Sequence, residues 1–194
     1  MKKKVITITF LLFYCFMFIF SETFYGEGTS ESPYLISTYL DLEQLRNYVN
    51  SDNKEYSTAC YRQTCDIVFP DGIKWNPIGK LKEGILFSGE YNGDGHTISN
   101  INCVAEYASV FEFLGGIVYN LGIENGCFKG DYTGSIASHG TQEGKIINCY
   151  NKASVIGKYR AGGICDNFNG LVLFCFNFGD VNTLTENSVR TGIS

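Results

Sequence analysis

The stretch EGKIINCYNKASVIGKYRAGGIC, residues 143–165, decides the fold because its pattern recurs on both sides. The segment GGIVYNLGIENGC, which begins at position 115, and the segment NGLVLFCFNFGDV, which begins at position 169, both resemble its first half. Repeats of this kind are typical of proteins in which each unit stacks on its neighbour and buries a continuous core. We therefore expect successive coils of about 26–28 residues.

Aligning the repeats gives four columns of positions that contain only aliphatic residues or cysteine. The columns are Val118, Ile146 and Val172; Leu121, Cys149 and Cys175; Cys127, Val155 and Val181; and Val110, Ile136, Ile164 and Ile193. Apolar side chains in such columns face inward when one coil stacks on the next. The apolar pieces are short, as strands of about five residues require. We predict an all-β fold, a right-handed parallel β-helix (β-solenoid), with the handedness taken from the general rule for parallel crossovers.

Glycine and asparagine mark the corners of the predicted coils. Gly116, Gly144 and Gly170 each precede an apolar piece, and glycine suits tight corners where φ is positive. Asn120 and Asn148 occupy equivalent positions, and we expect their side chains to form an amide ladder that caps backbone groups.

The column assignment predicts the roles of four cysteines. Cys149 and Cys175 belong in the core, where cysteine behaves as a small hydrophobic residue, and the same is expected of Cys127. Stacked neighbours lie about 4.8 Å apart, so a disulfide between Cys149 and Cys175 is sterically allowed. Cys165 follows an inward position and is expected to face outward as a free thiol.

Composition excludes several classes of protein. The 194-residue chain has a formal net charge of −5 and only 15 Lys+Arg, whereas binding to nucleic acid requires clustered positive charge. Its 15 Phe and 13 Tyr argue against disorder. His96 and His139 are isolated and no Cys-x-x-Cys pair exists, so we expect neither a metal site nor a cofactor. Cys60 and Cys65 either close a small loop disulfide or remain separate thiols.

The first residues resemble a targeting segment. Three lysines precede a nearly unbroken apolar run at 5–20, which is shorter than a membrane span and suits a signal peptide, residues 1–21. Retention as an N-terminal anchor is the alternative. We expect no membrane span after removal of the signal and a secreted or cell-surface location.

Residues 22–58 are predicted to form an N-terminal cap. In TYLDLEQLRNYVN, Asp41 with Gln44 suits a capping box. Leu42, Leu45 and Val49 share one face of a helix. We therefore expect a short capping helix at 41–50. Such a helix would cover the open core of the first coil.

The following segment, residues 59–105, is predicted to form irregular first coils. Asp66 is expected to satisfy turn amides. Asp94 and Gly95 lie in YNGDG, which we interpret as a tight turn rather than a calcium loop. His96 has no recognisable nucleophile partner, so we predict a structural or surface role for it.

The segments GGIVYNLGIENG, GKIINCYNKASVIGKYRAGGIC and YTGSIASHG resemble the GLUG-motif repeats of secreted and surface bacterial proteins. The upstream segments SPYLISTYLDLEQLRNYVN and FSGEYNGDGHTISNI resemble the stretch that leads into such repeats. The resemblance implies a parallel β-helix in large exported proteins, often adhesin-like and sometimes attached to proteases. It assigns residues 106–194 to GLUG-like β-solenoid repeats.

The last coil is predicted to be incomplete, because SVRTGIS at 188–194 begins another copy of the pattern at 159–165. We therefore expect self-association or missing C-terminal repeats.

These observations favour a non-catalytic module for adhesion or for presentation on a stalk. Tyr150 and Phe176 are expected to face outward, with Tyr132 and Tyr159 near the adjacent corner, where aromatic rings can bind a glycan or a host or matrix protein. No catalytic, cofactor-binding or metal-binding residue is assigned. A spacer region of a larger exported protease is a further alternative.

A carbohydrate-active β-helix, either a polysaccharide lyase or a glycosidase, is the main rival. Glu112, Ser138 and Asp166 would occupy one outward column, with the two carboxylates two coils apart. Without a catalytic role, these carboxylates are expected to be solvated surface charges.

Overall fold

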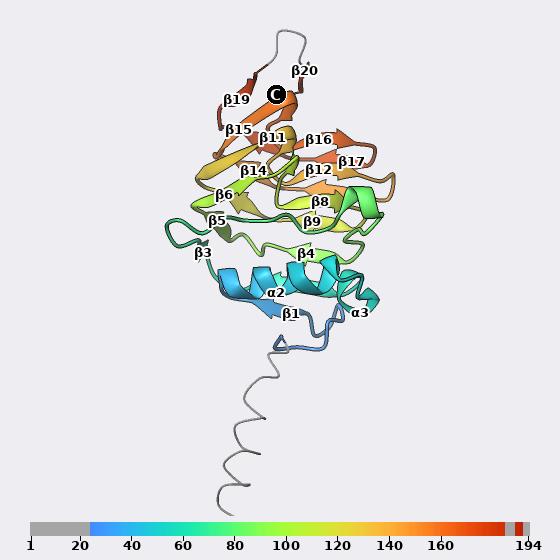
Figure 1. The fold of residues 1–194 in the computed structure, drawn as a ribbon. Helices are drawn as coiled ribbons and strands as arrows, with labels where there is room; N and C mark the ends of the chain where they lie inside the picture. The colour runs from blue at the N-terminus through green and yellow to red at the C-terminus, as the bar shows by residue number, and fades with distance from the viewer. Residues whose placement is uncertain (1–23, 185–188, 192–194) are drawn as a thin grey trace, which may run out of the picture.

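The computed structural model describes residues 24–184 and 189–191, and side chains through residue 184. This part of the chain is mostly β, with parallel sheets and few helices, as expected for a β-helix-like fold (Figure 1). The predicted signal peptide, residues 1–21, lies outside the described residues. No helix among the described residues is long and apolar enough to cross a membrane.

The strands of the described residues form four parallel sheets. Sheet A contains β1 Tyr34–Ile36, β2 Cys60–Gln63, β4 Glu90–Asn92, β9 Ile117–Tyr119, β13 Lys145–Ile147 and β17 Leu171–Leu173. Sheet B contains β3 Ile67–Val68, β5 Thr97–Ser99, β10 Gly122–Ile123, β14 Tyr150–Asn151 and β18 Phe176–Asn177. Sheet C contains β6 Ile101–Val104, β7 Tyr107–Ala108, β11 Gly126–Gly134, β15 Ser154–Gly162, β19 Val181–Thr183 and β20 Val189–Thr191. Sheet D contains β8 Phe111–Leu114, β12 Ala137–Gly140 and β16 Cys165–Phe168.

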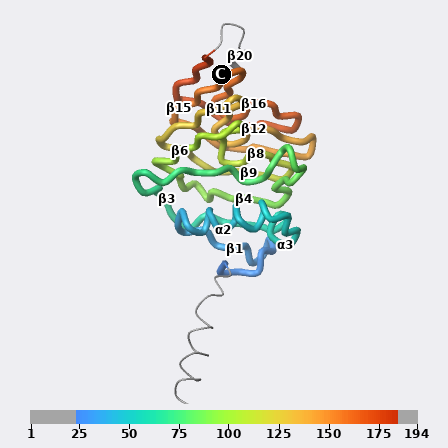
Figure 2. The backbone as a smooth tube through the Cα atoms, viewed as in Figure 1, coloured from blue at the N-terminus to red at the C-terminus, as the bar shows by residue number. Residues whose placement is uncertain are grey.

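Strand register confirms the first predicted column. Ile146 pairs with Val118 on one side and with Val172 on the other, as the alignment of the repeats requires. The strands of sheet A therefore lie side by side in the order in which they occur along the chain. The tube in Figure 2 shows successive coils of the chain stacked one above another.

Two further columns are buried as predicted. Their described members lie in the core: Leu121, Cys149, Cys175, Val110, Ile136 and Ile164. Ile193, the last member of the fourth column, lies outside the described residues.

The third column is wrong by one residue. Val155 pairs with Val181 as predicted, but its partner on the other side is Phe128, while Cys127 pairs with Ser154. A slip of one residue moves a side chain to the opposite face of a strand. Phe128 accordingly occupies the core, whereas Cys127 is only half-buried and is not the core residue that the alignment predicted.

The ladder of asparagine side chains is confirmed, but the amides of Asn120 and Asn148 make no hydrogen bond to a backbone group of the described residues. The Nδ2 of Asn148 donates to Oδ1 of Asn120 at 2.8 Å, and Asn120 donates to Oδ1 of Asn92 at 3.4 Å. Asn120 and Asn148 have φ values of 55° and 52°, in the left-handed region that asparagine tolerates. Phe174 adopts φ 54° at the equivalent position of the next coil without an amide to continue the ladder.

Glycine is required at these corners for a reason other than the predicted positive φ. Gly116, Gly144 and Gly170 are absent from the residues with positive φ. A Cβ on Gly116 would lie 2.0 Å from the carbonyl oxygen of Gly89, and a Cβ on Gly170 would lie 2.0 Å from that of Gly144. Close stacking of one corner on the next therefore excludes a side chain at these two positions.

The predicted helix is α2, Tyr39–Asn50, which begins two residues earlier than expected. Thr38 is the N-cap, and its capping box uses Asp41 as the third helical residue rather than pairing Asp41 with Gln44. The predicted face is correct, since Leu42, Leu45 and Val49 are all buried in the core. A four-residue helix, α3 Lys54–Ser57, and a short 3-10 helix, Leu81–Glu83, complete the helical elements of the described residues.

Candidate functional site

The predicted carboxylate column exists but is not a row of solvated charges. Ala137 pairs with Phe111 and with Cys165, so the next residue of each strand, Glu112, Ser138 or Asp166, falls in one column. Ser138 is fully buried and the side chain of Asp166 is only 1% exposed. Strand β11 contacts β12 and β16, and β15 contacts β16 and places Arg160 beside Asp166.

The members of this column are held by local contacts. Glu112 accepts a hydrogen bond from the backbone N–H of Leu81 at 2.9 Å, and burial raises the pKa of this carboxyl. The hydroxyl of Ser138 donates to the carbonyl oxygen of Glu112 at 3.1 Å and lies 3.2 Å from the Oγ of Ser109. The two carboxylates are thus separated by a filled layer, unlike the pair that flanks the scissile bond in a glycosidase.

Asp166 instead faces a cluster that we call the aromatic corner. It comprises Tyr107, Tyr132, His139, Tyr159, Arg160 and Asp166, contributed by strands of sheets C and D. Register places Tyr132 between Tyr107 and Arg160 in successive strands of sheet C. The Nε of Arg160 lies 3.3 Å from Oδ1 of Asp166.

Three tyrosine rings of the aromatic corner lie next to one another, although Tyr159 is one residue out of register with Tyr132. Tyr107 and Tyr132 stack with ring centroids 5.5 Å apart, and Tyr159 lies 5.6 Å from Tyr132. The guanidinium of Arg160 lies 5.0 Å from the centre of the Tyr132 ring, and His139 meets Tyr107 edge-on at 5.1 Å. Tyr132 and Tyr159 were expected near this corner from the sequence and Tyr107 was not, although Tyr107 precedes Tyr132 by close to one repeat.

Burial shifts the charge states at the aromatic corner. It raises the pKa of Asp166 to about 6, and the neighbouring Arg160 opposes this change only in part. Burial and the positive charge of Arg160 both lower the pKa of His139, to about 4. His139 is therefore neutral at pH 7. Within the part of the chain that the structure describes, its buried Nδ1 has no hydrogen-bond partner, and the carboxylate of Asp166 has only the ion pair with Arg160.

The predicted binding aromatics differ in exposure. Tyr150 pairs with Phe176 in the stack, as expected. Tyr150 is half-buried, because its ring lies against Gly122 and its hydroxyl donates to Glu124. Phe176 is 59% exposed and stacks on Phe178. Only Phe176 of the predicted pair therefore offers a largely free ring.

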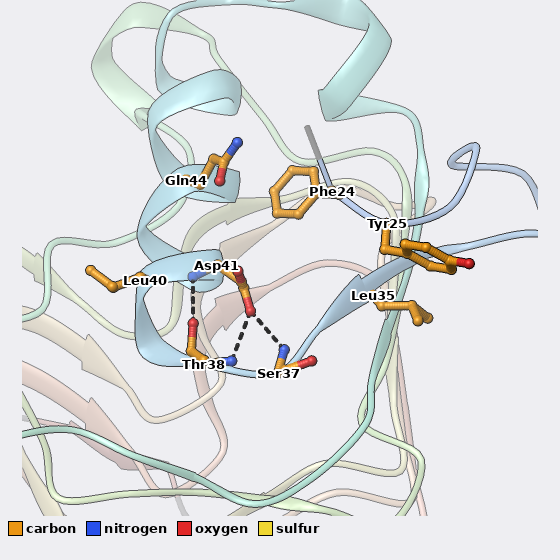
Figure 3. Close-up of a pocket in the computed structure, with 8 residues that line it drawn as sticks. All are labelled: Phe24, Tyr25, Leu35, Ser37, Thr38, Leu40, Asp41 and Gln44. Atoms are coloured by element: carbon orange, nitrogen blue, oxygen red, sulfur yellow. Dashed lines mark hydrogen bonds between the residues drawn. The ribbon is translucent and has the colours of Figure 1, made fainter. Parts of the chain in front are cut away.

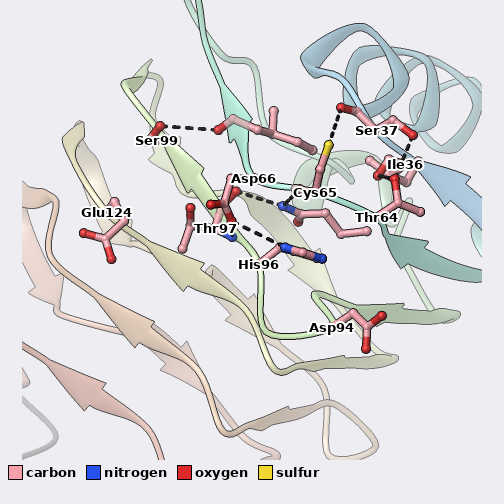
Figure 4. Close-up of polar contacts among 12 residues, drawn as sticks. Ile36, Ser37, Thr64, Cys65, Asp66, Asp94, His96, Thr97, Ser99 and Glu124 are labelled. Atoms are coloured by element: carbon pink, nitrogen blue, oxygen red, sulfur yellow. Dashed lines mark hydrogen bonds and ion pairs between the residues drawn. The ribbon is translucent and has the colours of Figure 1, made fainter.

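Asp66 and His96, two other polar residues singled out in the sequence, lie close to each other beside Thr97 (Figure 4). Asp66 accepts from the backbone N–H of Thr97, the first residue of β5, at 2.9 Å rather than from a turn amide, and lies 3.5 Å from Nδ1 of His96. Asp94 and Gly95 both have positive φ, as the tight turn requires. Among the described residues, no group of three or more His, Cys, Asp and Glu side chains is placed to hold a metal ion.

A hollow of about 420 Å³ lies at the N-terminal end, beside the first turn of α2 (Figure 3). Its polar groups already serve the helix: Asp41 accepts from the backbone N–H groups of Ser37 and Thr38, both at 2.8 Å, and Thr38 accepts from Asp41. The hollow is therefore a weaker candidate than the aromatic corner.

Cys165 does not face outward as predicted. It packs against the core, and burial raises the pKa of its thiol to about 12, which leaves it protonated at neutral pH. Cys60 and Cys65 are not joined, and all seven cysteines of the described residues are free thiols.

Comparisons with known proteins point to the cell surface. Over 148 residues the chain is 29% identical to "Halomucin" of Haloquadratum walsbyi, covering 72% of this chain and 2% of that protein. Over 148 residues it is 31% identical to a "Putative Gly-rich membrane protein" of Evansella cellulosilytica, covering 67% of this chain and 16% of that protein. The chain thus spans a small part of either relative, and both are consistent with a surface or exported protein. No family model matches the chain.

A solved structure shares the fold. The crystal structure titled "a putative immunoglobulin A1 protease from Bacteroides ovatus" matches with a TM-score of 0.65, covering 87% of this chain and 70% of that one. Sequence identity is 20%, so the match concerns the fold alone.

Proposed function

We propose that this chain is a non-catalytic module of a secreted or cell-surface protein, built as a right-handed parallel β-solenoid related to the GLUG-motif repeats. Residues 22–58 close one end, and residues 59–105 and 106–194 form the coils. The module serves adhesion or presents other parts of a longer protein on a stalk. The pairing of β13 with β9 and with β17, each about one repeat away along the chain, supports the solenoid.

The ligand in this proposal is a glycan or a matrix protein, bound at the aromatic corner. The observation that carries it is the series of three tyrosine rings about 5.5 Å apart, backed by Arg160 and Asp166. Neighbouring rings suit an extended polymer, and the partly exposed guanidinium of Arg160 beside them can donate hydrogen bonds to its hydroxyls. Tyr159 is 41% exposed and gives the corner its most accessible ring.

A binding array of glycans and matrix proteins tests the proposal. We expect binding by the unmodified protein, at least a tenfold weaker signal for Tyr159→Ala, and no change for Tyr25→Ala. Tyr25 is the matched control, since it is 83% exposed and is not part of the corner. Equal loss in both variants, or none in either, would rule out the aromatic corner as the binding site.

A carbohydrate-active enzyme is the second candidate, favoured by one observation. The pKa of Asp166, raised to about 6, is that of a carboxyl suited to proton transfer near neutral pH. A polysaccharide-cleavage assay on the same preparation decides the matter. Cleavage that is abolished by Asp166→Asn or Glu112→Gln would establish the enzyme in place of the adhesion module.

A spacer within a larger exported protease is the third candidate, and the fold neighbour named a putative protease favours it. It predicts neither binding nor cleavage by this chain.

A further inference from the structure

Two buried thiols occupy the same position in consecutive coils. Ile147 pairs with Leu173, and Tyr150 pairs with Phe176, so Cys149 stands opposite Cys175 between these two pairs. Both side chains face the core and are 1% and 7% exposed. The register therefore brings together two cysteines that are a full coil apart in the sequence.

The two sulfurs have the same orientation. The Sγ of Cys149 lies 3.3 Å from the carbonyl oxygen of Ile147, and the Sγ of Cys175 lies 3.3 Å from that of Leu173. The interaction between the two thiols raises the pKa of Cys149 and lowers that of Cys175. Cys175 thus becomes the thiolate first, and it also lies in the last coil whose side chains the structure describes.

We propose that Cys149 and Cys175 are a disulfide site that links two consecutive coils when the protein meets an oxidising environment. Neighbouring parallel strands are about 4.8 Å apart, within the Cα separation of about 4.4–6.8 Å that disulfides span. Cysteines of exported proteins meet such conditions after they leave the cytoplasm.

The oxidant is a small-molecule or protein disulfide. The Cys175 thiolate attacks one sulfur of this disulfide, forms a mixed disulfide and releases the other sulfur as a thiolate. Cys149 attacks the Sγ of Cys175, which forms the Cys149–Cys175 bond, and the second sulfur of the oxidant leaves and takes up the proton of Cys149. In total, two protein thiols lose two electrons and two protons, and one acceptor disulfide is reduced to two thiols.

The other cysteines of the described residues are placed less favourably. Cys103 pairs with Phe128 rather than with Cys127, so these two cysteines are one residue out of register. Cys165 lies near enough to Cys175 to affect the pKa of its own thiol, but it belongs to sheet D and has no register partner among the cysteines. Cys165 is therefore the competitor that an experiment must distinguish.

Peptide mapping of the full chain tests the proposal directly. The purified protein is incubated with oxidised glutathione, free thiols are alkylated, and the chain is digested without reduction. Trypsin leaves Cys149 in peptide 146–152 but leaves Cys165 and Cys175 together in peptide 161–190. A second protease that cleaves before Asp166 separates these two cysteines. We expect a Cys149–Cys175 cross-link; its absence after oxidation, or a Cys165–Cys175 cross-link in its place, would overturn the proposal.

Thermal unfolding gives an independent readout. A cross-link that closes a loop of this length raises Tm by roughly 5–10 °C over the reduced protein. Cys149→Val, a substitution of similar size, should remove this redox-dependent difference, whereas Cys127→Ser should retain it. A difference that persists in Cys149→Val would assign the effect to other cysteines and refute the site.

Discussion

The two ends of the described chain are both rich in aromatic residues, but they use them in opposite ways. At the N-terminal end, rings pack against one another in the core: Phe24, Tyr34, Tyr56 and Tyr61. In the last described coil, Phe174, Phe176 and Phe178 are 72%, 59% and 70% exposed. The two ends lie at opposite extremes of the tube in Figure 2.

The difference lies in what covers each end. Helix α2 buries its apolar face in the core beside β1. Strands β16, β17, β18 and β19 each end their sheet, with no further partner among the described residues. The outward side chains of this last coil are also more apolar than those of the preceding coil. Leu171 stands where the preceding coil has Lys145, and Phe174 stands at the corner position where it has Asn148. We call Leu171, Leu173, Phe174, Phe176 and Phe178 the apolar rim.

The largest effect is expected at the covered end. Leu45→Ala removes a fully buried side chain from α2 and should lower the free energy of unfolding by about 2–5 kcal/mol. Leu40→Ala on the same helix removes a side chain that is mostly exposed and should cost less than about 0.5 kcal/mol. Urea unfolding measures both, and equal costs would show that α2 does not stabilise the end of the stack.

Variants at the corner position of Asn148 and Phe174 compare an inner coil with the last described coil. Asn148→Ala loses the amide contact to Asn120 and places alanine at φ 52°, so it should cost about 1–2 kcal/mol. Phe174→Asn should instead stabilise by about 1 kcal/mol, because asparagine tolerates φ 54° and would extend the ladder. Urea unfolding that gave both variants the same sign would contradict a shared corner geometry.

The aromatic corner is expected to show compensating pH effects. The folded-state pKa of Asp166, about 6, lies above its ordinary value of 3.8, so this group contributes stability that is lost as pH rises from about 4 to 6. The folded-state pKa of His139, about 4, lies below 6.5, so this group contributes stability that is gained as pH rises over a similar range.

Single variants separate these two contributions. The free energy of unfolding of Asp166→Asn should rise with pH more steeply between 4 and 6.5 than that of the unmodified protein. His139→Gln should show the opposite change in slope. Denaturant unfolding at several pH values measures both, and parallel curves for the three proteins would refute the two pKa shifts.

The repeat itself could be predicted from the sequence, because each coil places the same residue types at inward sites and corners. Ile146 and Asn148 lie where the alignment put them. Cys127 was misplaced because Cys and Phe are both apolar, so the pattern could not choose between positions 127 and 128. The aromatic corner could not be predicted in full, because it depends on contacts between strands of sheets C and D, and an alignment of repeats gives only the pairing within one sheet.

Substitutions in the apolar rim are expected to have the smallest effect on the free energy of unfolding and a clear effect on self-association. Phe176→Ser combined with Phe178→Ser changes exposed side chains, so the free energy of unfolding should shift by less than about 0.5 kcal/mol. Exposed apolar surface beside unpaired strand edges favours contact between molecules, so the double variant should sediment with less self-association than the unmodified protein. Lys152→Ser, at the position of Phe178 in the coil below, is the matched control and should leave sedimentation unchanged. If the double variant self-associates as strongly as the unmodified protein, strand edges rather than the rim make the contact, and the difference between the two ends comes from backbone pairing alone.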